Sequence, residues 1–309
     1  ATTEIYTLSL HDALPIWRAY TASRRVCVLL SACDPGEWAD GVGEPYLDRH
    51  RMKSQEAVKL RNYGDLVDRY DALLGRCFDG GPAGEIDRMP VYHMTLRGDS
   101  PAPQRWLLGA GMHGDEPAGH LALLEFLEQD GEKLRGRVDL DVMPCINPWG
   151  YEYDRRENSD GIDINRCFEE EALEEVRLCK GLLESERFDL FLEFHEDWEF
   201  EGYYLFEVRQ EEMNRLGPAL IDAIRSHGPI YRHPEVEGFP VMDGVADATP
   251  PLLARHGIGS KPLPLWLFHA GVSYHTITSE TPSKHWDADT RIATHLSIAR
   301  NCVELLTPA

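Results

Sequence analysis

A glycine-rich turn between a buried strand and a helix carries two residues of the types that bind metal ions. His113 and Glu116 stand at the H-x-x-E spacing in the segment His113-Gly-Asp-Glu116. An imidazole and a carboxylate are two zinc ligands, and a hydrolytic zinc site has three protein ligands and one open position. The rest of the chain would have to supply a third ligand, a base and groups that hold a substrate.

Two further polar residues follow predicted strands. The apolar run over residues 188–194 stops at His195, and the strand predicted over residues 274–279 stops at Glu280. Sites in open α/β sheets form outside the carboxyl ends of strands, so His113, Glu116 and His195 are all placed for one edge of a sheet. Together with the free carboxylate of Glu280 they give three ligands and a base, as zinc-dependent hydrolysis needs.

Each of these residues also has a simpler interpretation. A histidine at a strand end is more often a hydrogen-bonded structural residue than a metal ligand. A glutamate such as Glu116 in the first turn of a helix commonly stabilises the helix dipole. Glu280 before Thr-Pro could be a solvated strand end. The prediction of a metal site therefore depends on the combination and not on any one residue.

Strands alternate with helices along the chain, which predicts an α/β fold with a mixed, largely parallel central sheet flanked by helices. Helices are predicted at residues 63–74, 170–183, 211–224 and 292–306, and from Pro117 to just before Gly131. Residues 79–84 are predicted to interrupt regular secondary structure after the first helix. The stretches 151–168 and 227–264 read as loops. Strands are predicted at residues 90–96, 106–110, 138–145, 188–194, 203–208, 265–268 and 274–279.

Composition limits the classes of protein to which this chain can belong. At 42% hydrophobic residues it can bury a sizeable core. Its net charge of -22 argues against nucleic acid and anionic membrane surfaces as partners, since both require basic patches. No apolar run approaches the ~20 residues that span a bilayer. The 7 cysteines are scattered without a C-x-x-C motif, which favours reduced thiols and a cytoplasmic setting.

The first 51 residues are predicted to be non-native. The string at residues 7–16, Thr-Leu-Ser-Leu-His-Asp-Ala-Leu-Pro-Ile, matches the translation of a common short-read sequencing adapter. Such a segment has to be left out of reasoning about the fold. The first methionine of the chain is Met52, so we expect residues 52–309 to form the catalytic domain.

Taken in order, the segments of the chain resemble the zinc carboxypeptidase family. His113-Gly-Asp-Glu116 is followed by Asn147-Pro-Trp-Gly150, then by Arg156-Glu-Asn-Ser-Asp-Gly-Ile-Asp-Ile-Asn-Arg166, His195 and Glu280-Thr-Pro282. The long segment, together with H-x-x-E, makes the resemblance specific. It implies a single phosphorylase/hydrolase-like domain. Succinylglutamate desuccinylase and aspartoacylase are related, with H-G-N-E at the first segment.

The resemblance implies a metal site with one zinc ion as the cofactor. His113, Glu116 and His195 would bind the ion. Glu280 would be the general base that activates the attacking water and then protonates the leaving amine. Asp163 would hydrogen-bond the far ring nitrogen of His113 and so fix its tautomer.

The resemblance also implies residues that hold the substrate. Arg156 would polarise the scissile carbonyl and stabilise the oxyanion. Asn165 and Arg166 would bind a substrate carboxylate, which suits the guanidinium fork. Arg155 is the runner-up for the role of Arg156, but the spacing to the following Asn and Gly favours Arg156. We interpret His120, four residues after Glu116, as structural or as a support for the ligands.

These assignments predict a zinc metallocarboxypeptidase that acts on a small peptide, including murein peptides. The alternative is an N-acyl amino acid deacylase, and a zinc-binding protein without turnover is a third interpretation. The family's mobile tyrosine has two candidates, Tyr231 and Tyr274, and neither has a convincing spacing. Asp243 and Asp247 could select a basic side chain, although such residues are more often solvated.

Overall fold

The strand β3 (Arg105–Ala110) shows how the apolar pattern of the sequence builds the sheet. Its side chains alternate, so that Trp106 and Leu108 enter one apolar cluster and Leu107 enters another. Because neighbouring side chains of a strand point to opposite faces, a fully apolar strand belongs in a sheet that is covered on both sides. The computed structural model describes residues 58–99, 102, 104–256, 259 and 261–307, and residues 49–309 form one unit.

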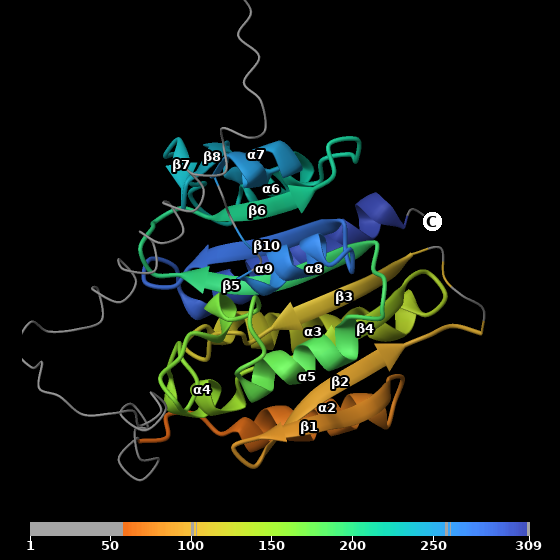
Figure 1. Ribbon diagram of the computed structural model, residues 1–309. Helices are drawn as coiled ribbons and strands as arrows, with labels where there is room; N and C mark the ends of the chain where they lie inside the picture. The colour runs from red at the N-terminus through yellow and green to blue at the C-terminus, as the bar shows by residue number, and fades with distance from the viewer. Residues whose placement is uncertain (1–57, 100–101, 103, 257–258, 260, 308–309) are drawn as a thin grey trace, which may run out of the picture. The chain divides into compact units, whose positions relative to one another are not determined.

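In the described part of the chain, ten strands form one mixed sheet in the order β1-β2-β4-β3-β5-β10-β6-β9-β8-β7 (Figure 1). The central strands β4, β3, β5 and β10 are parallel, and antiparallel pairs lie at both sides of them. The bounds are β1 Asp79–Ile86, β2 Met89–Leu96, β4 Asp139–Met143, β5 Leu190–Asp197, β6 Tyr204–Arg209, β7 Glu235–Val236, β8 Phe239–Met242, β9 Val245–Ala248 and β10 His275–Pro282.

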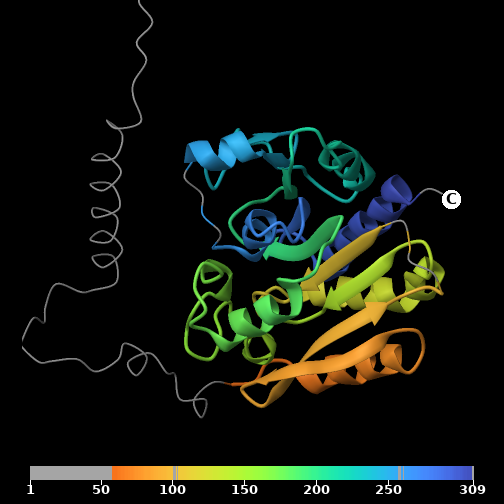
Figure 2. The same ribbon diagram turned by 45° about the vertical axis from the view of Figure 1, so that its right-hand side comes forward.

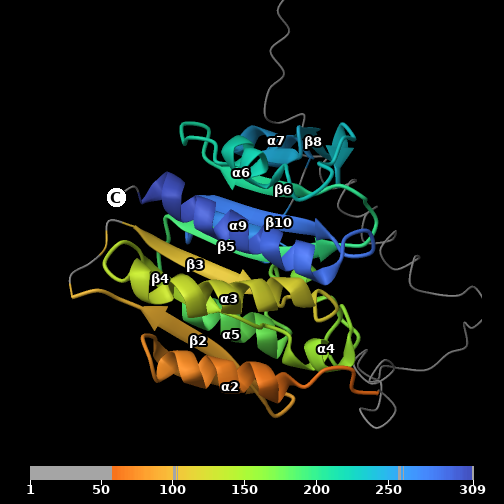
Figure 3. The same cartoon turned by 180° about the vertical axis from the view of Figure 1, so that it is seen from behind.

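Helices cover both faces of this sheet. Seen from behind, one face carries α2 (Tyr63–Leu74), α3 (Pro117–Leu134), α6 (Gly217–Ile224) and α9 (Ala288–Leu306) (Figure 3). The other face carries α5 (Glu174–Leu183) and α8 (Leu263–His269), and Figure 2 shows both layers from a second angle. Shorter helices lie in the connections: α4 (Pro148–Tyr153), η2 (Ile164–Arg166) and α7 (Pro250–His256). The predicted α/β fold with a mixed sheet flanked by helices is confirmed.

Several predicted elements differ from the observed ones. Residues 79–84 were expected to form a break, but they belong to strand β1, whose glycines fit its pairing with β2. Gly80 has φ 106, and a Cβ atom there would lie 2.4 Å from the carbonyl oxygen of His93. Residues 265–268 were expected to form a strand but lie in helix α8, which starts directly after Pro262. The stretch 227–264, expected to be loops, contains β7, β8, β9 and α7.

The predicted boundary at residue 51 lies outside the described residues. Within residues 58–307, no described helix is both long and apolar enough to cross a membrane. Helix α3 continues through Gly131, which was expected to lie beyond its end. The ring of Phe78 packs there, 3.0 Å from the position that a Cβ atom would take, so glycine makes room for the contact.

A buried carboxylate ties the edge of the parallel strands together. Asp141 on β4 accepts hydrogen bonds from Arg105 Nε (2.9 Å) and Nη2 (3.0 Å) and from His93 Nε2 (3.1 Å), and it also pairs with Arg97. Burial alone would raise its pKa, but these partners outweigh burial and lower the pKa of Asp141 to about 2. The ionised form therefore stabilises the folded state.

We expect Asp141→Asn to lower the free energy of unfolding by about 2 kcal/mol at pH 7. Because the folded-state pKa lies below the ordinary value of 3.8, the stabilisation is complete above that pH and is lost as pH falls toward 2. Urea unfolding at stepped pH values measures the difference between wild type and variant. The difference should narrow below pH 4, and a difference independent of pH would contradict the assignment.

Candidate metal centre

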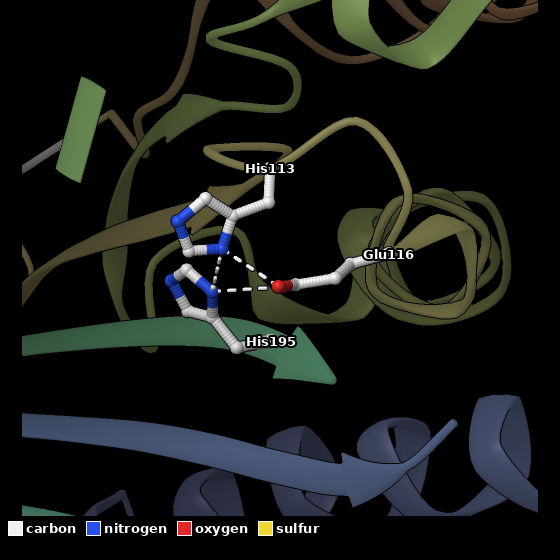
Figure 4. Close-up of side chains that lie close together, drawn as sticks. All are labelled: His113, Glu116 and His195. Atoms are coloured by element: carbon white, nitrogen blue, oxygen red, sulfur yellow. Dashed lines mark hydrogen bonds and ion pairs between the residues drawn. The ribbon is translucent and has the colours of Figure 1, made fainter. Parts of the chain in front are cut away.

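Three buried side chains converge beside the carboxyl ends of β3 and β5 (Figure 4). His113 Nδ1 lies 2.6 Å from Glu116 Oε1, and His195 Nδ1 lies 2.8 Å from Glu116 Oε2. The two Nδ1 atoms are 3.2 Å apart. Among the described residues, these are the ones identified as able to hold a metal ion, with ligand atoms within 4.8 Å of one another.

The separation of the two imidazole rings fits one small cation. Two ligand atoms on a tetrahedral zinc ion with bonds of 2.0–2.1 Å stand about 3.3 Å apart, close to the separation of the two Nδ1 atoms. The charges around the cluster also favour a cation. Although burial favours the neutral imidazole, Glu193 and Glu116 raise the pKa of His195 well above its ordinary value. The carboxylates thus favour positive charge at the point where the three side chains meet.

The outer nitrogen of each imidazole faces a second carboxylate. His113 Nε2 lies 3.2 Å from Asp163 Oδ1, and His195 Nε2 lies 3.2 Å from Glu193 Oε2. A carboxylate at Nε2 holds the proton on that nitrogen and leaves Nδ1 as an acceptor. At His113 the hydrogen bond to Asp163 favours the tautomer that a metal ligand needs, whereas His195 Nε2 and Glu193 lie close together without forming a hydrogen bond.

Asp163→Asn is expected to weaken metal binding by about 10–100-fold, because the neutral amide holds the proton on His113 Nε2 less strongly. Competition with a chromogenic chelator measures the metal affinity directly. Asp160→Asn, in the same loop but outside the His113 contact, is the matched control and should bind metal as the wild type does. Equal affinities in both variants would remove Asp163 from the support of the site.

Close backbone packing explains the glycine in the His113-Gly-Asp-Glu116 turn. A Cβ atom on Gly114 would lie 1.8 Å from the carbonyl carbon of Gly150, so the two turns meet backbone to backbone. The amide of Gly114 donates to the carbonyl of Arg155 at 2.9 Å. Asn147 caps α4 by accepting from Gly150 N (2.9 Å) and donates to the carbonyl of Glu157 (3.0 Å). The Asn147-Pro-Trp-Gly150 turn thus fixes the loop after α4 against the turn that carries His113 and Glu116.

Glu116 is held from its other side by β5. Its Oε2 accepts from the amide of Glu196 at 3.0 Å, and Glu196 Oε1 in turn accepts from the amide of Ala118 at 2.7 Å. The buried Glu196 is also ion-paired with Arg291. Burial would raise the pKa of Glu116, but His113 and His195 together hold it well below its ordinary range. These two hydrogen bonds therefore hold the first turn of α3 against strand β5 at the site.

Arg156 lies directly beside the cluster. Its Nη1 is 3.3 Å from Glu116 Oε1, and its Nε donates to Asp163 Oδ2 at 3.1 Å. Arg155 is exposed and contributes its backbone carbonyl to Gly114. The side chain with access to the centre is thus Arg156.

The residues expected to hold a substrate carboxylate, Asn165 and Arg166, line one cavity together with the His–Glu–His cluster. Asn165 is buried, and its Oδ1 accepts from the amide of Leu263 at 3.0 Å, which leaves the amide N–H2 group as a donor. Arg166 lies 3.5 Å from Glu237 in an exposed ion pair. Exposed pairs are weak, so Arg166 can exchange Glu237 for a substrate anion.

Glu280 stands next to the metal cluster without being part of it. In the parallel register of β5 and β10, Glu280 pairs with His195, and across the antiparallel pair β10–β6 it pairs with Tyr204. Burial is the main cause that raises the pKa of Glu280 well above its ordinary value, with added repulsion from Glu116 and Asp197. A carboxyl group with a raised pKa suits general acid–base work near neutral pH.

One cavity of about 610 Å³ brings together all eight predicted site residues: His113, Glu116, Arg156, Asp163, Asn165, Arg166, His195 and Glu280. The other candidates do not line this cavity. Tyr231 donates to the carbonyl of Glu235, and Tyr274 is 48% exposed. Asp243 pairs with Arg225.

Two further candidates have structural surroundings. Asp247 pairs with Arg209 (3.2 Å) and Arg215 (3.3 Å), away from the cavity. His120 is fully buried, its Nδ1 donates to the carbonyl of Glu116 (3.3 Å), and burial lowers its pKa to about 4. A neutral, buried imidazole in this position supports the turn and is not among the three convergent side chains.

Three residues at the site were missed by the sequence analysis: Glu193, Glu196 and Tyr204. Tyr204 lines the cavity and donates to Asp197 at 2.6 Å. Glu193 stands two residues before His195, a spacing that puts both side chains on one face of β5, and this signal could have identified it. Nothing local marks Glu196 or Tyr204, because their partners come from other segments.

Comparison with known proteins shows to which families and solved structures this chain is similar. Residues 102–231 match the family model of the succinylglutamate desuccinylase/aspartoacylase catalytic domain. No curated protein matches the chain. A provisionally named metallopeptidase from Shewanella amazonensis is similar in structure, with TM-score 0.66 and 26% identity over 80% of this chain and 93% of that one.

Two metallo-carboxypeptidases share the fold at lower identity. The protein from Burkholderia cenocepacia has TM-score 0.56 and 15% identity over 77% of this chain and 67% of that one. The protein from Pseudomonas aeruginosa, solved with (2-guanidinoethylmercapto)succinic acid, has TM-score 0.55 and 17% identity over 77% and 67%.

The family-model match and the structural neighbours indicate a hydrolase, and the His–Glu–His cluster is its candidate site for a metal ion. The resemblance of the sequence to the zinc carboxypeptidase family, with its succinylglutamate desuccinylase/aspartoacylase relatives, is confirmed.

Proposed function

We propose that this protein is a zinc-dependent metallocarboxypeptidase that hydrolyses the amide bond next to a free carboxylate in a small peptide. One observation carries the proposal: Glu280 and Arg156 line the same cavity as the three metal-binding side chains. A site that only bound a metal ion would need neither a carboxylate poised outside the ligand set nor a guanidinium beside it.

The proposed metal is zinc, held by His113, Glu116 and His195. Two imidazoles and one carboxylate are the ligand set of hydrolytic zinc sites, with one position left open. When bound, the ion supplies a Lewis acid that polarises the substrate carbonyl and lowers the pKa of water.

Glu280 is the proposed general base. Its carboxylate takes a proton from the water that attacks the carbonyl carbon, and it then gives that proton to the leaving nitrogen as the C–N bond breaks. Its half-buried position beside His195 and Tyr204 raises its pKa above the ordinary value, which suits a group that accepts a proton and returns it. One group can therefore serve both steps.

Arg156 is the proposed oxyanion partner. It is held in place by Asp163, and its Nη1 lies beside Glu116, so its charge is fixed where the carbonyl oxygen becomes negative. Asn165 and Arg166, about ten residues further along the chain, would hold the substrate carboxylate from the side of the cavity. These two anchors set which amide bond lies between Glu280 and Arg156.

The second candidate is an N-acyl amino acid deacylase, and the family match over residues 102–231 favours it. Both reactions attack an amide next to a residue with a free carboxylate, so the same residues serve either one. The difference lies in what precedes that amide: a peptide in one case, a simple acyl group in the other.

Amine release by the zinc-loaded protein tests the proposal. The panel contains short peptides with free and with amidated C-termini, murein peptides, and N-acetyl and N-succinyl amino acids. Cleavage of free-ended peptides that stops on addition of a chelator supports the carboxypeptidase. Cleavage of acyl amino acids alone would identify the protein as a deacylase. A folded, zinc-bound protein that cleaves nothing in the panel would count against hydrolysis of either kind.

A further inference from the structure

A fully buried histidine of helix α9 contacts strand β10 from the face of the sheet opposite the cavity. Helix α9 packs along β10 (Figure 3). His295 Nδ1 lies 3.0 Å from Ser279 Oγ, and His295 Nε2 lies 3.0 Å from Thr281 Oγ1. Neighbouring side chains of a strand point to opposite faces, so Glu280 points into the cavity while the residues on either side of it point to α9. The imidazole thus bridges the two neighbours of the proposed base.

The hydrogen bonds of this bridge are complete. The hydroxyl of Tyr203 lies 2.8 Å from Ser279 Oγ, and the side chains of the network are fully buried. Burial, with repulsion from His195 and Arg291, lowers the pKa of His295 to about 3. The ring is therefore neutral near pH 7, with one donor and one acceptor nitrogen. Because a hydroxyl can donate or accept, the two hydroxyls match the neutral ring in either tautomer.

The bridge stands where strand β10 loses one of its two neighbours. Within the described sheet, the pairing of β10 with β6 ends at Glu280 and Tyr204. Thr281 and Pro282 continue the strand in pairing with β5. A strand end with fewer backbone hydrogen bonds opens more readily than a strand centre. The contacts of His295 therefore restrain β10 at the point where its backbone pairing becomes one-sided.

The same face of α9 also holds the strand that carries His195. Arg291 lies one turn before His295, and it pairs with the buried Glu196, which directly follows His195 on β5. One helix thus contacts the residue beside a candidate metal ligand and the residues beside the proposed base. A single rigid element can therefore set the position of Glu280 relative to the His–Glu–His cluster.

We propose that His295 is a positioning residue for Glu280. Its hydrogen bonds to Ser279 and Thr281 fix the carboxylate relative to the His–Glu–His cluster, and the role of that carboxylate rests on the proposed function. A misplacement of ~1 Å can cost about 100-fold in rate, so loss of one of the two hydrogen bonds should lower kcat about 10-fold. KM and metal affinity should change little, because Ser279 and Thr281 face away from the cavity.

Thr281→Val tests the bridge by a small change in the zinc-loaded full-length protein. Valine keeps the shape of threonine and removes the hydroxyl that contacts His295. We expect kcat to fall about 10-fold at unchanged KM and zinc affinity. Thr276→Val is the matched control, because the Thr276 hydroxyl is buried on the same strand but has no hydrogen-bond partner among the described residues. Its kcat should stay at the wild-type value, and equal kcat in the two variants would overturn the proposal.

A double-mutant cycle separates positioning from a general structural loss. In the Glu280→Gln background the proposed base is absent, so Thr281→Val should lower the residual turnover by less than about 2-fold. A hydroxyl that only stabilised the fold would lower turnover by the same factor in both backgrounds. Such additivity would overturn the proposal.

Amide hydrogen exchange measures the restraint without turnover. Residues 279–282 should exchange faster in Thr281→Val than in the wild type, and at the wild-type rate in Thr276→Val. Unchanged exchange in Thr281→Val would overturn the proposal. Absence of turnover in the wild type would reject the hydrolase, and with it the base that His295 positions. Turnover in the wild type with an additive cycle would reject the positioning role alone.

Discussion

A Glu280→Gln variant is expected to bind zinc as tightly as the wild type and to hydrolyse amides about 10²–10⁴-fold more slowly. Glutamine keeps the shape of the side chain but has no basic oxygen to take the proton of the attacking water. The cluster of His113, Glu116 and His195 does not include residue 280, so its affinity for metal should persist. Metal content and kcat on the best substrate of the panel are the two measurements.

Glu199→Gln is the matched control for this experiment. Glu199 is an exposed carboxylate that lines the same cavity, so the change removes the same charge without removing the proposed base. Its kcat should stay near that of the wild type. Unchanged turnover in Glu280→Gln would exclude Glu280 as the base, and loss of the metal would make it a ligand instead.

Removal of a ligand is expected to have the second large effect. His195→Ala should lower the metal affinity more than 100-fold, because even loss of a supporting hydrogen bond costs about 10–100-fold. A metal that binds only the folded state stabilises it by about 4 kcal/mol at 1,000 times its Kd, which corresponds to roughly 10 °C in Tm. Zinc should therefore raise the Tm of the wild type and not that of the variant.

His275→Ala controls for the loss of a buried histidine. His275 is also on a central strand, where its Nε2 lies 2.9 Å from Glu207, far along β10 from the cluster. This variant is expected to lose stability but to keep the rise in Tm with zinc. A zinc-dependent Tm shift of wild-type size in His195→Ala would show that the ion binds elsewhere.

Most of the local structure could be predicted from the sequence. Helix α2 was predicted at its observed bounds, Tyr63–Leu74, because its apolar residues recur with the period of a helix. Strands β2, β3 and β6 were predicted to within one residue at either end, since apolar residues predominate in each of them between turn signals. The apolar residues of these elements recur with the period of a helix or a strand, so their secondary structure can be predicted without knowing which segments pack against them.

The wrong predictions of secondary structure concern segments whose conformation depends on another segment that contacts them. The glycine-rich residues 79–84 have no strand pattern of their own, and they become β1 because β2 supplies the hydrogen-bonding partners. Residues 265–268 are too short for periodicity to separate a strand from a helix. Pro262 and Asn165, which accepts the amide of Leu263, set the start of a helix there. Neither signal lies within the four residues.

The sequence by itself determined which residues are candidates for the site. His113 and Glu116 share one turn at a short-range spacing, and the resemblance to the zinc carboxypeptidase family added Arg156, Asp163, Asn165 and Arg166 in one loop. Only the tertiary structure decided what surrounds these groups. The ring of Tyr204 beside Glu280 arises from the register of β6 and β10, and the contact of Glu196 with the amide of Ala118 arises because β5 and the first turn of α3 meet in space. Contacts between residues distant in the chain are set by packing, and packing leaves no pattern within a single segment.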